Sequence, residues 1–347
     1  MNRSLIFAYP GRLDLNTGGY AYDRKVIGGL ESLGWTVTPL SLGDGFPAPL
    51  PGVRADAEAQ LSALEDGSLV VIDGLAFGVL DDWAIREAER LKIVALVHHP
   101  LALETGLSQV VQADLRAREK RALRAPRLVV VTSPMTAREL TAHYAVPPET
   151  IAVAVPGTEP APRASATGTP PQILSIGTLI PRKGHDVLLD ALKLIQDIEW
   201  NARIVGSRDL DPATADALEA KVRAHGLQNR VELTGESTDT RAALASADIF
   251  ALASRYEGFG MVFAEALSQG VPIVACAAGA VPEVVPAEAG FLVPVDDAEA
   301  FAGALRRLLT DPEEHRRCAD AAFEAGARLP RWHDTAQIIA SRLANIA

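Results

Sequence analysis

Two glutamates, Glu257 and Glu265, stand eight residues apart in the segment 255–266, which reads RYEGFGMVFAEA. An apolar run ends just before this segment and a helical pattern follows it, so the glutamates flank a glycine-bracketed turn between a strand and a helix. Backbone N–H groups at a helix N-terminus attract anions such as phosphate, and carboxylates accept hydrogen bonds from sugar and ribose hydroxyls. The spacing fits a site for such groups, but a helix cap at Glu257 and a solvated Glu265 explain it equally well.

Two motifs in the first half of the chain could also contact a ligand. Gly18 and Gly19 open a helical pattern, and adjacent glycines let a backbone approach a ligand closely or simply form a turn. His98 and His99 end an apolar run. A histidine pair could bind a metal, but no Asp, Glu or Cys lies at metal-ligand spacing nearby, and neighbouring residues on an extended chain point to opposite faces. We therefore expect no metal there; a packed or surface position is the ordinary alternative for His98.

Short apolar runs alternating with helical patterns must position these residues. In the first half the runs are Ser4–Ala8, Trp35–Leu40, Leu69–Ile72, Ile93–Val97, Leu128–Thr132 and Ile151–Val155. In the second half they are Ile173–Ile176, Ala202–Val205, Val231–Leu233, Ile249–Leu252, Ile273–Ala275 and Phe291–Val293. Near-continuous β-branched runs of this kind are typical of parallel strands buried on both faces. The pattern predicts an α/β fold with two doubly wound, Rossmann-like sheets.

The chain length of 347 residues suits two domains. The proline-rich segment 156–171 separates the two rounds of strands and is expected to be an exposed linker. We expect residues 1–160 to form an N-terminal domain and residues 171–330 a C-terminal one, facing across a cleft at the carboxyl ends of their strands, where open α/β sheets bind ligands. The last segment, 331–347, either caps the second domain or returns to the first.

Composition and charge exclude several functions. With 33 basic and 44 acidic side chains the net charge is −11, which disfavours a dedicated nucleic-acid-binding protein. Two cysteines cannot form a disulfide framework and fit a reducing cytoplasm. No run approaches the length of a membrane span, and the apolar run within residues 1–10 is too short for a signal peptide, so this segment is expected to form the first strand.

The segment EGFGMVFAEALSQGVPIVACAAGAVPEVV, with Glu257 and Glu265, resembles the E-x7-E region of retaining glycosyltransferases of family 4, which have the GT-B fold. The resemblance extends from Ile173 through GFLVP and more weakly over the first half. It implies that Glu257 contacts the hydroxyls of a donor sugar and Glu265 the ribose of its nucleotide. It also implies that backbone amides of the turn bind near the sugar and diphosphate, namely those of Gly258, Phe259, Gly260 and Met261.

A second segment, SIGTLIPRKG at 175–184, resembles the G-R-L-x-x-x-K-G motif of the same family. Lys183 falls on the lysine that neutralises the donor diphosphate, whereas Thr178 stands where the family usually has arginine. Arg182 either contacts phosphate as well or is a solvated surface residue. The resemblance also gives Gly18 and Gly19 a role beside the donor diphosphate and the acceptor, and places His98 at the reacting sugar.

The resemblance implies a retaining glycosyltransferase that moves a hexosyl group from a UDP- or GDP-sugar to a hydroxyl acceptor. The expected catalytic residues are His98, Lys183 and Glu257, with no cofactor and no metal, because Lys183, glycine-loop amides and a helix N-terminus replace the cation. The acceptor is a small molecule, a glycan or a lipid-linked sugar. Alternatives are a GT-B sugar phosphorylase, a nucleotide-sugar epimerase, or a non-catalytic nucleotide-sugar-binding protein, which Thr178 favours slightly.

One further segment bears on location. Residues 114–127, DLRAREKRALRAPR, carry six cations against two acids. A basic helix on an acidic protein could dock on the anionic inner face of a membrane, and a solvated helix face is the commoner explanation. We expect a cytoplasmic protein that either contacts the inner face of the membrane through this helix or exposes the helix to solvent.

Overall fold

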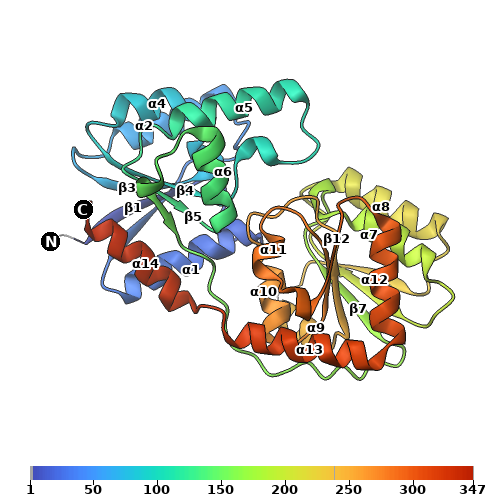
Figure 1. Ribbon diagram of the computed structural model, residues 1–347. Helices are drawn as coiled ribbons and strands as arrows, with labels where there is room; N and C mark the ends of the chain where they lie inside the picture. The colour runs from blue at the N-terminus through green and yellow to red at the C-terminus, as the bar shows by residue number, and fades with distance from the viewer. Residues whose placement is uncertain (1–2, 238, 347) are drawn as a thin grey trace. The chain divides into compact units, whose positions relative to one another are not determined.

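The computed structural model describes residues 3–237 and 239–346; Met1, Asn2 and Ala347, at the ends of the predicted terminal segments, lie outside them. The chain divides into two compact units (Figure 1). Unit 1 comprises Met1–Gly157 and Pro330–Ala347, and unit 2 comprises Thr158–Leu329. The structure thus divides the chain at 157 and 329, and the last helix belongs to unit 1.

Unit 1 contains a six-stranded parallel sheet of order β2-β1-β3-β4-β5-β6. Its strands are β1 Ser4–Tyr9, β2 Thr36–Ser41, β3 Leu69–Asp73, β4 Lys92–Val97, β5 Leu128–Val131 and β6 Ile151–Val153. Every residue of β3 and β5 is buried, because helices cover both faces of the sheet. The strand order reverses between β1 and β3, the kind of place where open α/β sheets bind ligands.

The helices of unit 1 are α1 Gly18–Ser32, α2 Pro51–Ser62, α3 Gly74–Phe77, α4 Asp81–Glu87, α5 Gln109–Ala122, α6 Pro134–Tyr144 and α14 Trp332–Ala344. The last of these packs against the first. A Cβ built on Gly29 of α1 would lie 2.6 Å from Cβ of Ala336 in α14. The absence of a side chain at Gly29 therefore sets how closely the two helices approach.

Unit 2 contains a second six-stranded parallel sheet, of order β12-β11-β10-β7-β8-β9. Its strands are β7 Gln172–Ile176, β8 Asn201–Val205, β9 Val231–Gly235, β10 Ile249–Leu252, β11 Ile273–Cys276 and β12 Gly290–Val293. Its helices are α7 His185–Leu194, α8 Pro212–Ala224, α9 Thr240–Ala245, α10 Met261–Ser268, α11 Val281–Val284, α12 Ala298–Thr310 and α13 Pro312–Ala327. Here the order reverses between β7 and β10.

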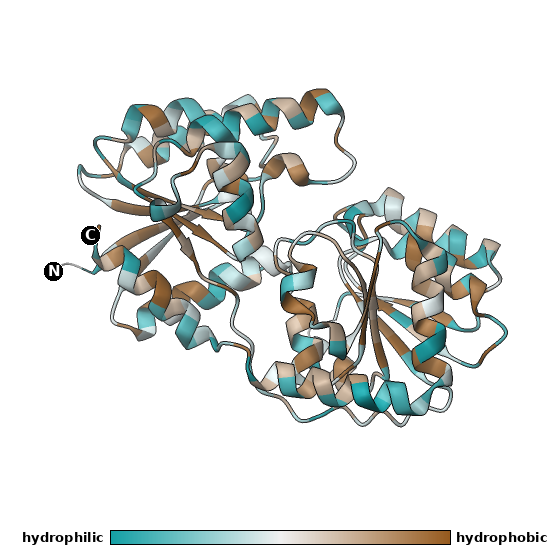
Figure 2. Cartoon of the chain, in the orientation of Figure 1, coloured by the Kyte–Doolittle hydropathy of each residue, from teal (hydrophilic) through white to brown (hydrophobic). Residues whose placement is uncertain are grey.

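The predicted fold of two doubly wound α/β sheets is confirmed, and all twelve apolar runs are strands. Figure 2 shows the strands of both sheets as hydrophobic and the helices as mixed, as expected for helices that bury one face. The exposed linker predicted at 156–171 is partly wrong. Pro156, Gly157 and Thr158 are buried, and the backbone N–H groups of Ala164 and Ser165 donate to carbonyls of unit 2.

Candidate functional site

The site residues of unit 2 meet where its strand order reverses. Strands β7 and β10 pair directly, and the loop carrying Arg182 and Lys183 follows β7 while the turn carrying Glu257 follows β10. The carboxyl ends of neighbouring parallel strands lie at one edge of a sheet. The topology therefore brings together two motifs that lie 74 residues apart in the sequence.

Glu257 is the centre of a buried ionic cluster. Nζ of Lys183 lies 2.7 Å from Oε1 of Glu257, and the hydroxyl of Ser254 donates to the same oxygen at 2.6 Å. The guanidinium of Arg182 lies 3.5 Å from Oε2. The side chains of Arg182 and Lys183 are each 15% exposed, so the alternative of a solvated surface Arg182 is wrong.

The two cations of this cluster keep Glu257 ionised. Burial alone would raise the pKa of Glu257, but Lys183 and Arg182 hold it below its ordinary value. The carboxylate is therefore ionised at neutral pH and lies beside two cationic side chains. These cations can also attract an anionic ligand. Because Lys183 pairs with Glu257 here, its amine would have to exchange that partner for a ligand phosphate.

The loop from Gly177 to Gly184 is held in place by hydrogen bonds from Arg255 and His185. The backbone N–H of Arg255 donates to the Arg182 carbonyl at 2.8 Å, and the Arg255 guanidinium donates to the Pro181 carbonyl at 2.5 Å and to Asp186 at 2.7 Å. Nε2 of the buried His185 donates to the Gly177 carbonyl at 3.0 Å. Burial lowers the pKa of His185 to about 4, so the ring is neutral.

The turn before α10 depends on glycine. Gly260 has φ +88°, and a Cβ there would lie 2.6 Å from the Phe263 ring. Gly260 is also the N-cap of α10, and no side chain of the described residues caps this helix. The Phe263 N–H donates to the Gly260 carbonyl at 2.9 Å, and the positive end of the helix can still attract an anion. The predicted turn residues Gly258, Phe259 and Met261 are partly exposed around it.

Glu265 lies outside the cluster at Glu257. Its Oε2 accepts a hydrogen bond from the hydroxyl of Thr240 at 3.4 Å. Burial raises the pKa of Glu265, against an opposing effect of Arg241. The two glutamates thus have different neighbours and opposite pKa shifts, and they can perform different tasks on one ligand.

In unit 1 the structure brings Gly19 and His98 together. Thr17 caps α1, Gly18 and Gly19 form its first turn, and a Cβ on Gly19 would lie 3.5 Å from Cδ2 of His98. The His98 ring also faces two carboxylates that the sequence motifs do not indicate. Its Nε2 lies 3.2 Å from Oδ1 of Asp23 and 3.2 Å from Oδ2 of Asp73.

The presence of these carboxylates changes the argument about metal binding at His98. The expectation of no metal at His98 and His99 rests on the absence of an acidic residue nearby in the sequence, but the fold supplies Asp23 from α1 and Asp73 from β3. Their ligand atoms and that of His98 all lie within 4.8 Å of one another, close enough to hold a cation. His99 has a different neighbour, Glu104, at 3.5 Å.

Two sequence signals point to these acids in retrospect. Asp73 ends the buried run LVVID, and a polar residue at the carboxyl end of a buried strand is a candidate site residue. Asp23 interrupts the apolar face of α1 that Tyr22, Val26 and Ile27 share, and a buried acid is seldom placed there without a partner. No comparable pattern points to Ser254.

The basic segment in unit 1 is largely α5, and part of its charge is used internally. Arg118 and Arg121 pair with Asp81 at the start of α4, and Arg121 also pairs with Asp82 at 2.6 Å. Glu119 is buried and accepts a hydrogen bond from the Leu101 backbone at 2.9 Å. No helix within the described residues is long and apolar enough to cross a bilayer.

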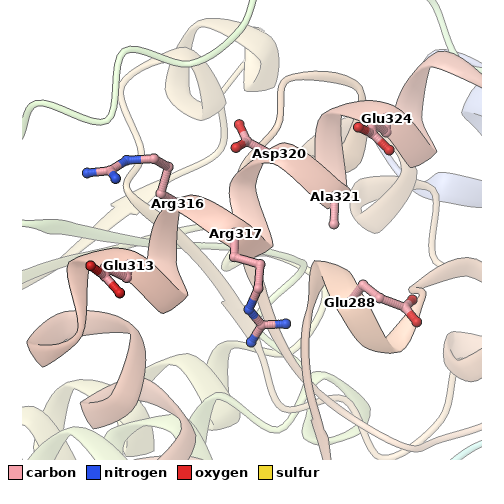
Figure 3. A pocket seen from close by; sticks show the side chains of 7 residues that line it. All are labelled: Glu288, Glu313, Arg316, Arg317, Asp320, Ala321 and Glu324. Atoms are coloured by element: carbon pink, nitrogen blue, oxygen red, sulfur yellow. The ribbon is translucent and has the colours of Figure 1, made fainter.

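A hollow of about 560 Å³ lies beside α13 in unit 2, away from these motifs in the sequence (Figure 3). Its lining residues are Glu288, Glu313, Arg316, Arg317, Asp320, Ala321 and Glu324. Acidic side chains outnumber basic ones, so this hollow does not suit an anionic ligand. The cluster around Glu257 is the better candidate in unit 2.

Comparison with known proteins supports this choice. The family model "Glycosyl transferases group 1" matches residues 159–325, and "Glycosyltransferase Family 4" matches residues 30–161. The first match contains the cluster at Glu257 together with Glu265, and the second contains His98.

Two curated relatives are an MMP alpha-(1->4)-mannosyltransferase of Mycolicibacterium hassiacum and a D-inositol 3-phosphate glycosyltransferase of Corynebacterium glutamicum. The first is 30% identical over 264 residues, covering 70% of this chain and 63% of its own length. The second is 27% identical over 286 residues, covering 75% of this chain and 68% of its own length. This chain therefore matches about two thirds of the length of these relatives.

Solved structures with a similar fold include sucrose-phosphate synthase from Thermosynechococcus elongatus, with a TM-score of 0.83, 22% identity and 98% of each chain covered. Another is Anabaena HepE in complex with UDP-glucose, with a TM-score of 0.76, 20% identity, and coverage of 98% of this chain and 100% of that one. These likenesses establish the GT-B fold.

Proposed function

Because the chain belongs to the group 1 glycosyltransferases, we propose that it transfers a hexosyl group from a UDP- or GDP-sugar to a hydroxyl acceptor with retention of anomeric configuration. The observation that carries this proposal is the buried cluster of Arg182, Lys183 and Glu257 at the strand-order reversal of unit 2. It joins two cationic side chains to a hydrogen-bond acceptor, as a donor that carries both diphosphate and sugar hydroxyls requires.

In this proposal the donor diphosphate binds to Lys183, Arg182 and the N-terminus of α10. Negative charge grows on the leaving phosphate as the glycosidic bond breaks, so these groups stabilise the transition state more than the ground state. They take the place of a divalent cation at the diphosphate. Glu257 accepts hydrogen bonds from the sugar hydroxyls, and Glu265 from the ribose.

The proposed reaction takes place on one face of the sugar. The bond from the anomeric carbon to the phosphate oxygen breaks as the acceptor oxygen bonds to the same carbon, and the acceptor proton passes to the leaving phosphate oxygen. Glu257 is assigned to the hydroxyls, so the proposal includes no enzyme nucleophile. The names of relatives support hexosyl transfer, since one is a mannosyltransferase and a GDP-mannose-dependent enzyme is also similar.

A non-catalytic nucleotide-sugar-binding protein is the second candidate. It is favoured by Thr178, which stands where an arginine would add a further positive charge beside the diphosphate. This candidate predicts donor binding without release of nucleotide for any acceptor.

Binding of UDP-, GDP-, ADP- and dTDP-sugars by thermal shift, followed by nucleotide release with acceptor mixtures, tests the proposal. A donor at 100 times its Kd stabilises the native state by about 2.7 kcal/mol. We expect one nucleotide class to stabilise the wild type, and Glu257→Gln to abolish the shift. Glu313→Gln, an exposed change of the same chemistry on α13, is the matched control and should keep it.

The possible outcomes separate the candidates. A donor shift with nucleotide release that depends on an acceptor supports transfer, and release that depends on free phosphate instead indicates a phosphorylase. Binding without release under all conditions favours the non-catalytic protein. If no nucleotide sugar stabilises the wild type, the proposal is overturned.

We also place the protein in the cytoplasm, with peripheral membrane contact through α5. The buried thiols of Cys276 and Cys318, which form no disulfide, favour a reducing compartment. The contact would use the cations of the segment 114–127 that are not paired with Asp81 or Asp82. Sedimentation with vesicles containing anionic lipid checks it, and equal binding to neutral vesicles would contradict it.

A further inference from the structure

Two buried carboxylates converge on one nitrogen of His98 in unit 1. Asp23, on α1, is fully buried, and Asp73, at the end of β3, is 2% exposed. An oxygen of each lies 3.2 Å from Nε2 of His98. The second oxygen of Asp73 is already occupied, because Oδ1 accepts a hydrogen bond from the Leu75 backbone at 2.8 Å.

Asp23 accepts no such hydrogen bond from the described residues. Both of its oxygens, and Nε2 of His98, are buried without a hydrogen bond of good geometry. A buried carboxylate without a partner is strongly unfavourable. Asp23, without a partner, and Asp73, with one oxygen still free of a backbone donor, therefore require positive charge at the nitrogen where they meet.

The surroundings supply little of that charge. The titratable or charged groups that affect Asp23 and His98 from the same helix are Tyr20, Tyr22 and Arg24. Burial and the nearby carboxylates raise the pKa of both tyrosines, so both are neutral. The Tyr22 ring packs edge-on against His98, with centroids 5.4 Å apart. Beyond the end of β5 the neighbour is also neutral, since the Thr132 hydroxyl donates to the His98 carbonyl at 3.0 Å.

The position of the ring decides which nitrogen meets a ligand. Nε2 is buried and the Cδ2 edge lies beneath Gly19, while 18% of the His98 side chain is exposed. The exposed part therefore falls toward the opposite, Nδ1 side of the ring. A proton on Nε2 satisfies the carboxylates, and a second proton on Nδ1 gives the ring the positive charge they require.

We propose that Asp23 and Asp73 are positioning residues that hold His98 as a doubly protonated imidazolium, whose Nδ1–H is a fixed donor to a sugar or phosphate oxygen. In this state His98 has no lone pair and cannot act as a general base. A neutral histidine can accept a proton, whereas both ring nitrogens of an imidazolium are hydrogen-bond donors. The part of this inference that concerns substrate is based on the proposed glycosyl transfer; the protonation state is independent of it.

The electrostatics agree with the geometry. Burial alone would lower the pKa of His98, but Asp23 and Asp73 raise it well above its ordinary value. Burial raises the pKa of Asp23, and His98 opposes that rise. The alternative occupant of the same three atoms is a divalent cation, and the experiment must distinguish it from a proton.

Imidazole nitrogen and proton NMR of the full chain tests the protonation state directly. We expect both nitrogens of His98 to stay protonated through about pH 8, well above the ordinary pKa of about 6.5. Asp23→Asn and Asp73→Asn should each lower the pKa of His98 by more than one unit. Glu104→Gln removes the carboxylate beside His99 and is the matched control, which should leave His98 unchanged.

An activity measurement then tests the role. In Asp23→Asn, kcat/KM should fall about tenfold between pH 6 and pH 8, following deprotonation of His98, whereas the wild type should show no such loss. A purely structural role would lower activity equally at both pH values. If the wild type transfers no sugar, the proposed function fails and the NMR result still decides the protonation state.

Three results would overturn the inference. The first is wild-type His98 titrating near 6.5, and the second is a neutral ring at pH 7 with an unprotonated Nδ1. The third is about one tightly bound metal ion per chain, detected by elemental analysis and released by a chelator with a change in the His98 signals. If an asparagine variant does not fold, the wild-type titration alone decides whether His98 is held doubly protonated.

Discussion

At the scale of single residues, the cluster at Glu257 combines stability with binding. Lys183 and Ser254 share one carboxylate oxygen and Arg182 lies near the other. Removing one partner of a buried pair leaves a charge uncompensated, which costs about 3 to 5 kcal/mol where no other partner remains. If Lys183 is removed, Arg182 and Ser254 still compensate part of the charge on the Glu257 carboxylate.

We therefore predict that Lys183→Ala lowers the free energy of unfolding of unit 2 by about 2 to 3 kcal/mol. The double variant Lys183→Ala with Glu257→Gln should lose less, because the carboxylate that lacks its partner is also removed. Hydrogen exchange of the β10 amides measures both. Additive losses in the double variant would contradict a direct interaction.

The same cluster has a defined pH dependence. The pKa of Glu257 is below its ordinary value of 4.5, so its contribution to stability is complete above that value and is lost as the pH falls through the lowered pKa. We predict that Glu257→Gln removes this part of the acid sensitivity of unit 2. Acid titration followed by hydrogen exchange checks it, and an unchanged profile would show that other groups dominate.

At the scale of elements, one glycine fixes the turn between the site loop and α7. Gly184 has φ +62°, and a Cβ there would lie 2.0 Å from the Ala253 carbonyl oxygen. Gly226, after α8, has a similar φ of +69°, with no described atom within 4 Å of its Cβ position. Substitutions at these two glycines therefore distinguish the cost of backbone strain from the cost of steric overlap within one unit.

We predict that Gly226→Ala costs about 1 kcal/mol, from the left-handed conformation alone. Gly184→Ala should cost at least about 3 kcal/mol, because the backbone of the loop must also move. Thermal unfolding of both variants checks this. Equal losses would mean that the loop adjusts freely and does not hold Lys183 in place.

Elements with strong hydrophobic runs can be predicted from the sequence, and elements that bury small residues cannot. Most strands, such as β3 and β5, are near-continuous apolar runs, which makes them recognisable. Helix α13 gives a weak helical pattern in the sequence, because the residues it buries are Cys318, three alanines and one glycine, which give little contrast between its faces. Helix α2 gives a weak pattern as well, because it buries only Ala57 and Leu61.

For the site, the sequence identifies residues that belong to recognisable motifs and not those joined by topology. Lys183 and Glu257 are predicted from their own segments, and the pairing of β7 with β10 brings them into contact. Asp23 and Asp73 reach His98 because β1, β3 and β4 are adjacent in the sheet. Their separation in the sequence, 50 residues between the two acids, gives no hint of this contact.

At the scale of the whole molecule, unit 1 is completed by the end of the chain. Helix α14 packs on α1, where Gly29 faces Ala336, and the Trp332 ring lies 5.7 Å from that of Tyr22. The Thr335 hydroxyl donates to the Val155 carbonyl at 2.8 Å. The last helix therefore contributes to the core of the first unit.

We predict that Gly29→Ala destabilises unit 1 by about 2 kcal/mol, because its methyl group would overlap Ala336. Gly28→Ala, one residue earlier in the same helix, has no described atom within 4 Å of its Cβ position and should be neutral or stabilise by up to about 1 kcal/mol. Hydrogen exchange of the β1 amides reports both effects. A stabilising Gly29→Ala would show that α14 is not tightly packed there.

The chain leaves unit 1 after Gly157 and returns at Pro330, and these two points touch. A Cβ on Gly157 would lie 2.2 Å from the backbone nitrogen of Trp332. The chain thus leaves unit 1 for unit 2 and returns to it at nearly the same point. A domain inserted in this way can be exchanged for another while the domain that carries it keeps its structure. Recombination at this junction could give unit 1 a different partner module while leaving its own sheet and its Asp23, Asp73 and His98 intact.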